Sequence, residues 1–167
     1  NFALRGTAAQ PTFEGNMAIT NGRVSQFNFD SINTTYSYES DIVRWETSMA
    51  PTPASELAAR GYFPLHLSFT DSAEVIVSDK PMEVRLIARQ LPLSILTATA
   101  EDMEVTGGTI NGEVLLENTW IDPDMSGTVT IRDGGFQMED LGIEYDDLDM
   151  DLTFDDNTIR LDSLVVA

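Results

Sequence analysis

The sequence predicts an all-β protein made of antiparallel strands, and two observations carry this prediction. Apolar and polar residues alternate along most of the chain, as they do on strands that bury one face of a sheet. A pattern near the end of the chain also recurs near its start, which is typical of stacked or elongated architectures. Short antiparallel strands with one apolar face must cover that face with another layer or curl around something.

The alternation is clearest between residues 147 and 155. One parity is apolar and the other is acidic: Leu148, Met150, Leu152 and Phe154 against Asp147, Asp149, Asp151 and Asp155. Successive side chains of a strand point to opposite faces of the sheet. The sequence therefore predicts a sheet with one apolar side and one charged side in this region.

The repeat places two partial copies of one unit in the chain. Four residues recur 112 positions later, so that Pro11, Gly15, Ile19 and Gly22 match Pro123, Gly127, Ile131 and Gly134. With a four-residue insertion in the second copy, Ile32, Tyr36 and Tyr38 match Leu148, Leu152 and Phe154. We therefore predict that residues 1–50 end a first unit, residues 51–106 form connecting strands with a short helix, and residues 107–167 start a second unit.

In chain order, the alternation predicts about a dozen strands separated by tight turns. Asn21-Gly22 is the strongest hairpin signal, because both residues tolerate positive φ. Pro64 falls inside an alternating run and indicates an edge strand or a bulge. Residues 54–60 have helical propensity, but the repeat favours a strand there. The predicted strands lie at residues 2–4, 17–19, 24–29, 32–38, 43–49, 54–60, 63–69, 75–77, 84–88, 110–116, 129–131, 148–154 and 159–161.

One stretch departs from the period of two. Between residues 91 and 102, Leu93, Leu96 and Ala100 follow a helical spacing, with acidic residues at the end of the run. The sequence predicts one short amphipathic helix here, broken by Gly107-Gly108.

The composition argues against several classes of partner. The chain carries 28 acidic and nine basic residues, giving a formal charge of −19, and Lys80 is its only lysine. No face can collect enough positive charge to bind a nucleic-acid backbone. Such acidity keeps proteins soluble in salt and fits a halophilic source. The chain has no cysteine, and therefore neither disulfides nor thiolate metal sites.

The sequence offers no catalytic constellation. His66 is the only histidine and lies on the polar parity of its run, which favours a surface position. Without cysteine or a second histidine, the usual nucleophile and base pairs cannot form, and paired carboxylates would have to converge for hydrolysis. The acids of residues 146–156 alternate with large apolar residues, so a solvated face fits better than a calcium loop. We therefore expect neither an enzyme nor a bound metal or cofactor.

The apolar parity has two interpretations, the core of a closed sandwich or the lining of a ligand groove. Periodicity alone favours the sandwich. The residues concerned are Met17, Ile19, Phe63, Leu65, Leu67, Phe69, Val84, Leu86, Val114, Leu116, Val129, Ile131, Leu148, Met150, Leu152, Phe154, Ile159 and Leu161.

The order of short motifs resembles a known family. The run MEVRLIARQLPLSIL is followed by a glycine pair, GGTINGEVLLENT, a P-x-x-x-G-x-x-x-I segment with a glycine turn, LGIEYDDLDMDLTF and IRLDSLVV. This order resembles the C-terminal region of the TamB family (translocation and assembly module subunit), within the AsmA-like superfamily. The resemblance covers nearly all of the chain and is clearest over residues 82–166.

The resemblance implies a particular architecture and function. The fold would be an elongated, folded-over antiparallel sheet (a β-taco or repeating β-groove) with an apolar concave face. The parent protein would be anchored in the inner membrane of a diderm bacterium and extend through the periplasm. The apolar face would shield phospholipid acyl chains between the two membranes, or assist the assembly of outer-membrane β-barrels and protein secretion. A BamA-like outer-membrane barrel would be a partner. The first alternative is a closed structural or adhesive β-sandwich, and the second is an acid-dependent hydrolase.

Overall fold

The computed structural model describes residues 1–24, 27–70, 77, 79–98, 104–138, 143–156 and 158–166. These residues form ten strands and one short 3₁₀ helix. In chain order they are β1 (Phe2–Gly6), β2 (Pro11–Val24), β3 (Phe27–Glu39), β4 (Ile42–Ala50), β5 (Glu56–Pro64), β6 (Pro81–Pro92), η1 (Leu93–Ala98), β7 (Glu104–Thr119), β8 (Pro123–Met138), β9 (Ile143–Asp156) and β10 (Thr158–Val165).

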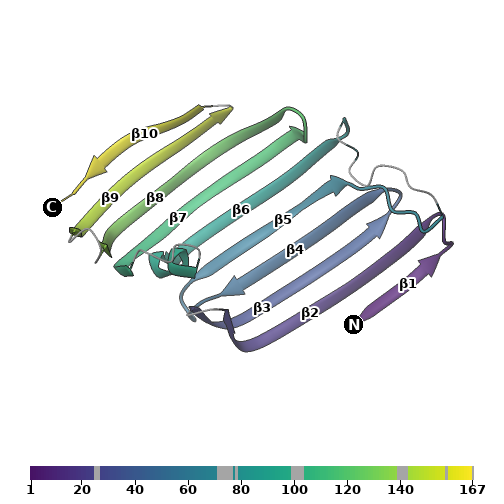
Figure 1. Cartoon of the computed structure of the whole chain (residues 1–167), viewed down its shortest axis with the longest axis horizontal. Coiled ribbons are helices and arrows are strands. Elements are labelled where there is room, and N and C mark those ends of the chain that lie inside the picture. Colours follow the sequence, from purple (N-terminus) through teal and green to yellow (C-terminus); the bar gives the residue numbers. More distant parts are fainter. Residues whose placement is uncertain are drawn as a thin grey trace.

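The ten strands make one open sheet in sequence order, with β1 and β10 at its two margins (Figure 1). Every neighbouring pair is antiparallel. The predicted class, an elongated and folded-over all-β sheet with one short helix, is confirmed. The described residues form no second sheet, so the closed sandwich favoured by periodicity is not the architecture.

The register separates an apolar face from a polar face. One row of directly paired residues crosses nine strands without a charge: Ile19, Ile32, Met49, Leu57, Ala88, Gly112, Val129, Leu152 and Leu161. The adjacent row points to the other side and is mostly polar: Ala18, Asn33, Ser48, Ala58, Ile87, Glu113, Thr128, Thr153 and Arg160. We call these sides the apolar face and the polar face.

The few buried side chains gather at the two ends of the strands. At one end, η1 lies against β7 and reaches β3, and Leu91, Leu93 and Ile131 are buried there. At the other end, the chain leaves β5 and runs past the β3–β4 turn toward the β1–β2 turn, where Tyr38 and Met82 are buried. We call residues 65–70, which make this crossing, the strap.

The predicted repeat relates the observed strands. β2 and β8 begin at Pro11 and Pro123, which lie 112 residues apart, whereas β3 and β4 begin 116 residues before β9 and β10. Positive φ recurs as well, at Asn21 and Asp133 with φ of 51° and 52°. We call β1–β4 the first unit and β7–β10 the second unit.

Four sequence predictions differ from the structure. Asn21-Gly22 forms no hairpin turn but lies inside β2, which continues to Val24, and Gly22 pairs with Phe29. The strand predicted over residues 63–69 ends at Pro64, because the chain turns out of the sheet into the strap. The helix is limited to one 3₁₀ segment, since β6 continues to Pro92; its predicted continuation over residues 99–102 lies outside the described residues, as does the predicted strand at Val75. Gly107-Gly108 ends no helix but lies inside β7, where the pairing with β8 is irregular.

Candidate functional site: an open apolar face

The register places fifteen of the eighteen candidate residues on the apolar face. These are Met17, Ile19, Phe63, Val84, Leu86, Val114, Leu116, Val129, Ile131, Leu148, Met150, Leu152, Phe154, Ile159 and Leu161. The other three, Leu65, Leu67 and Phe69, belong to the strap, and the side chain of Phe69 is 73% exposed. Their predicted place on a strand of the sheet is wrong, because β5 ends before them.

The candidate set missed an aromatic cluster on the first unit. The rings of Phe13 and Tyr38 stack with centroids 5.1 Å apart, and Phe13 also meets Phe2 and Tyr36. Trp45 contacts Phe63 edge to face at 5.3 Å. The signal was present in the sequence, because the repeat aligns Tyr36 and Tyr38 with two residues of the predicted apolar parity.

Much of the apolar face is open to solvent. Met17 is 49% exposed, Leu86 45% and Leu161 50%, on strands at the start, middle and end of the sheet. The chain has an accessible surface of 10444 Å², whereas a compact monomer of 18.4 kDa has about 8,200 Å². The excess area reflects the open sheet, and exposed apolar side chains that gather on one face are typical of a binding site.

The strap is held over its end of the sheet by hydrogen bonds. The Tyr38 hydroxyl donates to Asp41 Oδ1 at 3.1 Å and accepts from the Leu67 amide at 2.9 Å. His66 Nδ1 lies 3.0 Å from the same Asp41 oxygen. Burial, followed by the hydrogen bond to Asp41, raises the pKa of Tyr38 above its usual value, although the Leu67 amide opposes this. His66, predicted as a surface residue, is therefore a half-buried part of this contact.

Further backbone bonds fix the path of the strap. The Leu65 amide donates to the Asp41 carbonyl at 2.9 Å, and the Phe69 amide donates to the Ala8 carbonyl at 2.8 Å. The strap therefore spans from the β3–β4 turn to the β1–β2 turn and limits the apolar face of the first unit at this end.

The polar face carries ion pairs between neighbouring strands. Arg85 pairs with Glu113, Arg89 with Glu56, and Arg132 with Asp151. The hydrogen bond to Asp151 raises the pKa of Arg132. Bonds from Thr153 and Arg160 lower the pKa of Asp162. This face is a hydrated exterior and agrees with the interpretation of the acidic run as a solvated face.

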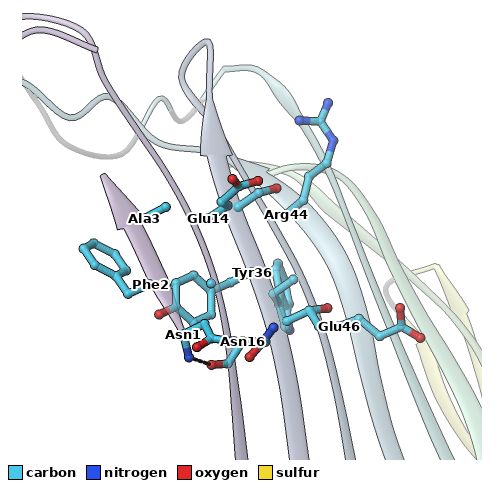
Figure 2. A pocket seen from close by; sticks show the side chains of 12 residues that line it. Asn1, Phe2, Ala3, Glu14, Asn16, Tyr36, Arg44 and Glu46 are labelled. Atoms are coloured by element: carbon cyan, nitrogen blue, oxygen red, sulfur yellow. Dashed lines mark hydrogen bonds between the residues drawn. The ribbon is translucent and has the colours of Figure 1, made fainter. Parts of the chain in front are cut away.

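A shallow pocket of about 570 Å³ lies over β1–β4 (Figure 2). Three neighbouring rows line it. Two belong to the polar face and contain Glu14 and Arg44, and Asn16 and Glu46, while the row between them contains the apolar-face residues Phe2, Tyr36 and Trp45.

Among the described residues, no group of three or more histidine, aspartate or glutamate side chains converges as a metal site. In the same residues, no helix is long and apolar enough to cross a membrane. Comparisons with family models, curated proteins and solved structures found no match to this chain.

Proposed function

We propose that this chain is a non-enzymatic segment of an envelope protein that shields phospholipid acyl chains on its apolar face. The observation that carries the proposal is the charge-free row across nine strands, in which Ile19 is 39% exposed, Leu161 is 50% exposed and the large side chains between them are partly exposed. The resemblance to the TamB family supports a place in the periplasm, as part of a protein anchored in the inner membrane. The acidity and the low lysine content support a saline environment.

The energetics of lipid transfer require a continuous surface. Each methylene that leaves water for an apolar surface gains about 0.8 kcal/mol, so an acyl chain cannot cross an aqueous gap without shielding along its length. Nine strands spaced about 4.8 Å apart give an apolar row about 38 Å long. One leaflet of a membrane has about 15 Å of hydrocarbon. The row is therefore longer than one acyl chain and contains no charged residue at which the chain would have to stop.

A second function, assistance to nascent outer-membrane β-barrels beside a BamA-like partner, follows from the same resemblance. The open apolar face fits this function as well, because barrel strands also have one apolar side. The two functions differ in what the face contacts, so the lipid experiment separates them.

Photo-crosslinking on neighbouring positions of one strand tests the proposal. A benzophenone side chain is placed at Met17 on the apolar face or at Ala18 on the polar face, both of which are exposed. Leu152 and Thr153 give the matched pair on the second unit. The 167-residue chain is then irradiated with vesicles of phosphatidylethanolamine and phosphatidylglycerol, and phospholipid adducts are measured by mass spectrometry.

We expect adducts from Met17 and Leu152 at several times the yield from Ala18 and Thr153. Equal yields from the two faces would contradict lipid binding by the apolar face. If the apolar positions gave adducts only when an unfolded outer-membrane barrel was added, and then with the barrel protein, the barrel-assembly function would replace the lipid function.

A further inference from the structure

The apolar face carries a group of polar side chains on β3 and β4. Three pairs of directly opposed residues lie on this face: Thr34 with Thr47, Tyr36 with Trp45, and Tyr38 with Val43. All of them except Val43 carry a hydroxyl or an indole N–H. Across β5–β8, the rows through Thr34 and Tyr36 contain no side-chain nitrogen or oxygen: Ala59, Leu86, Val114, Gly127, Gly61, Val84, Leu116 and Met125. We call Thr34, Tyr36, Trp45 and Thr47 the polar zone.

The second unit lacks this polar zone. The corresponding pairs of β9 and β10 are Met150 with Leu164, Leu152 with Leu161, and Phe154 with Ile159. Ser163, which follows Thr47 by 116 positions, is not in this set, because the irregularity of β10 brings Leu164 opposite Met150 instead. Equivalent strands of the two units therefore differ in whether their apolar face can form hydrogen bonds.

Several groups of the polar zone are available to a ligand. The Oγ1 atoms of Thr34 and Thr47 lie 3.1 Å apart, and their hydrogen bond uses only one of the two hydroxyl hydrogens. Within the described part of the chain, the side chains of Tyr36 and Trp45 form no hydrogen bond, and no buried side-chain nitrogen or oxygen atom lacks a partner. The Tyr36 hydroxyl and the Trp45 indole N–H are therefore open to solvent.

Tyr36 and Trp45 lie between two glycines on the neighbouring strands. Gly15 of β2 is opposite Tyr36, and Gly61 of β5 is opposite Trp45. The Tyr36 hydroxyl lies 2.5 Å from the place that a Cβ at Gly15 would occupy, so the ring leans over β2. The hydroxyl therefore lies on the side of the pair that is away from the second unit.

This arrangement matches the two chemical parts of a phospholipid. Tyrosine and tryptophan combine an apolar ring with a polar group, and they gather at membrane surfaces at the level of the headgroups. The ester carbonyl oxygens of a phospholipid accept hydrogen bonds, whereas its acyl chains accept none. We propose that the polar zone binds the glycerol esters of a phospholipid and orients its acyl chains across β5 toward the second unit. This inference rests on the proposed lipid binding and adds a direction to it.

The dimensions of the sheet fit this orientation. Three strand spacings of about 4.8 Å separate β4 from β7, which gives about 14 Å. The hydrocarbon of one membrane leaflet is about 15 Å thick. An acyl chain that starts at Trp45 therefore crosses β5 and β6 and ends near β7. The reverse orientation would place the esters on Leu152 and Leu161, which offer no donor.

Phospholipids with a photoreactive group at one of two depths test the orientation. Vesicles of phosphatidylcholine carry a diazirine either next to the ester or next to the methyl end of one acyl chain, and the wild-type chain is irradiated with each. Cleavage after arginine separates residues 24–60, which contain β3 and β4, from residues 90–160, which contain β7–β9. We expect the ratio of adducts on 24–60 to adducts on 90–160 to be at least about fivefold higher for the label next to the ester, the effect of one ordinary hydrogen bond.

Removing the two open donors tests the residues that set the direction. The double variant Tyr36→Phe with Trp45→Phe keeps two rings on the apolar face but loses the hydroxyl and the indole N–H. We expect the two labels to give ratios within about twofold of each other, and the total adduct yield to stay within about twofold of the wild type, because the apolar surface remains. The matched control is Tyr62→Phe, since Tyr62 lies opposite Arg44 on the polar face. It should leave the fivefold difference unchanged.

Transfer of the donors to the second unit tests the direction in reverse. Leu152→Tyr and Leu161→Trp are added to the Tyr36→Phe and Trp45→Phe chain, which moves the pair to its equivalent place in the repeat. We expect the label next to the ester to react mainly with residues 133–160, whereas in the wild type it reacts mainly with residues 24–60. Circular dichroism shows whether each variant keeps its fold, and a loss of fold would not move the adducts to a new place.

The possible failures of this inference and of lipid binding are distinguishable. Adducts with equal ratios for the two labels in the wild type would overturn the orientation and leave lipid binding standing. An undiminished difference in the Tyr36→Phe and Trp45→Phe chain, or an equal loss in Tyr62→Phe, would overturn the role of the polar zone. A wild-type chain that gives no adduct with either label would overturn lipid binding and the orientation together.

Discussion

The first and second units share one plan but differ in what covers their apolar faces. Ile19 and Ile131 are equivalent by the repeat, yet Ile19 is 39% exposed and Ile131 only 8%. The second unit contacts η1, and Ile131 lies in a row with Ile110 and the buried Leu91. η1 also reaches β3 of the first unit, where Phe29 is 5% exposed, and at the opposite end of the strands the strap is bonded to Tyr38. Equivalent strands of the two units are thus covered differently, because the segments between the units pack against them at different places.

The side chains on the apolar face also differ between the two units. At equivalent positions, Tyr36, Tyr38 and Trp45 of the first unit are replaced by Leu152, Phe154 and Leu161 in the second. At these positions the first unit presents three aromatic rings, two of them with hydroxyls, and the second unit presents two aliphatic side chains and one phenyl ring. A repeat can therefore keep one continuous apolar face while changing the side chains along it.

The largest expected contrast is between Ile131→Ala and Ile19→Ala. Removing the buried Ile131 side chain should lower the free energy of unfolding by about 3 kcal/mol, because it leaves a cavity in the row that Ile131 forms with Ile110 and Leu91. Removing the exposed Ile19 side chain should lower the free energy of unfolding by about 1 kcal/mol. Urea unfolding of both variants measures the difference, and equal losses would contradict the unequal cover of the two units.

Gly127→Ala and Gly15→Ala give the next contrast. Gly127 has φ +137°, and an added Cβ would lie 2.1 Å from the Glu113 carbonyl oxygen, which is backbone. At Gly15 the closest atoms would belong to the Tyr36 side chain, which can turn away, and the Asn1 carbonyl oxygen at the start of the chain would lie 2.8 Å from the added Cβ. We expect losses of about 2 kcal/mol at Gly127 and about 1 kcal/mol at Gly15. Thermal unfolding of the two variants, followed by circular dichroism, checks the order.

Tyr38→Phe should affect the strap, whereas Phe154→Tyr at the equivalent position should not. The first change leaves the Leu67 amide without its partner, and we expect a loss of about 1 kcal/mol. The folded-state pKa of Tyr38 is raised, so its contribution is complete below about pH 10 and is lost as pH rises through the folded value. The free energy of unfolding, measured with urea between pH 8 and pH 11, should therefore fall less steeply with pH in Tyr38→Phe than in the wild type. Parallel pH profiles would contradict this.

The smallest effect is expected at Arg5→Ala. Arg5 lies 2.9 Å from Glu14, but their side chains are 71% and 60% exposed. The second unit has Glu117 and Ser126 at the equivalent positions and lacks the pair. We expect a loss below about 0.5 kcal/mol that disappears in high salt. A larger loss at high salt would show that Arg5 contributes by packing.

The sequence predicted the strands and faces because these depend on local alternation. It could not predict that Leu65, Leu67 and Phe69 leave the sheet, since their alternation is the same in a strand and in the strap. The outcome depends on Asp41 and Tyr38, which lie more than twenty residues earlier. The unequal burial of Ile19 and Ile131 has a similar origin, because Ile131 lies in a row with Ile110 and Leu91, which come from other strands. An alternation with a period of two shows which face of the sheet a residue lies on, but it carries no information about contacts between distant segments.

The central claim, that the apolar face contacts acyl chains, is tested most directly by fluorescence quenching on β6. In a background of Trp45→Phe and Trp120→Phe, one tryptophan is introduced by Leu86→Trp on the apolar face or by Ile87→Trp on the polar face. Phospholipid brominated on its acyl chains quenches a tryptophan that it touches. We predict strong quenching at position 86 and little at position 87, with no quenching at either position by the unbrominated lipid. Equal quenching at both positions, or none at position 86, would contradict the account.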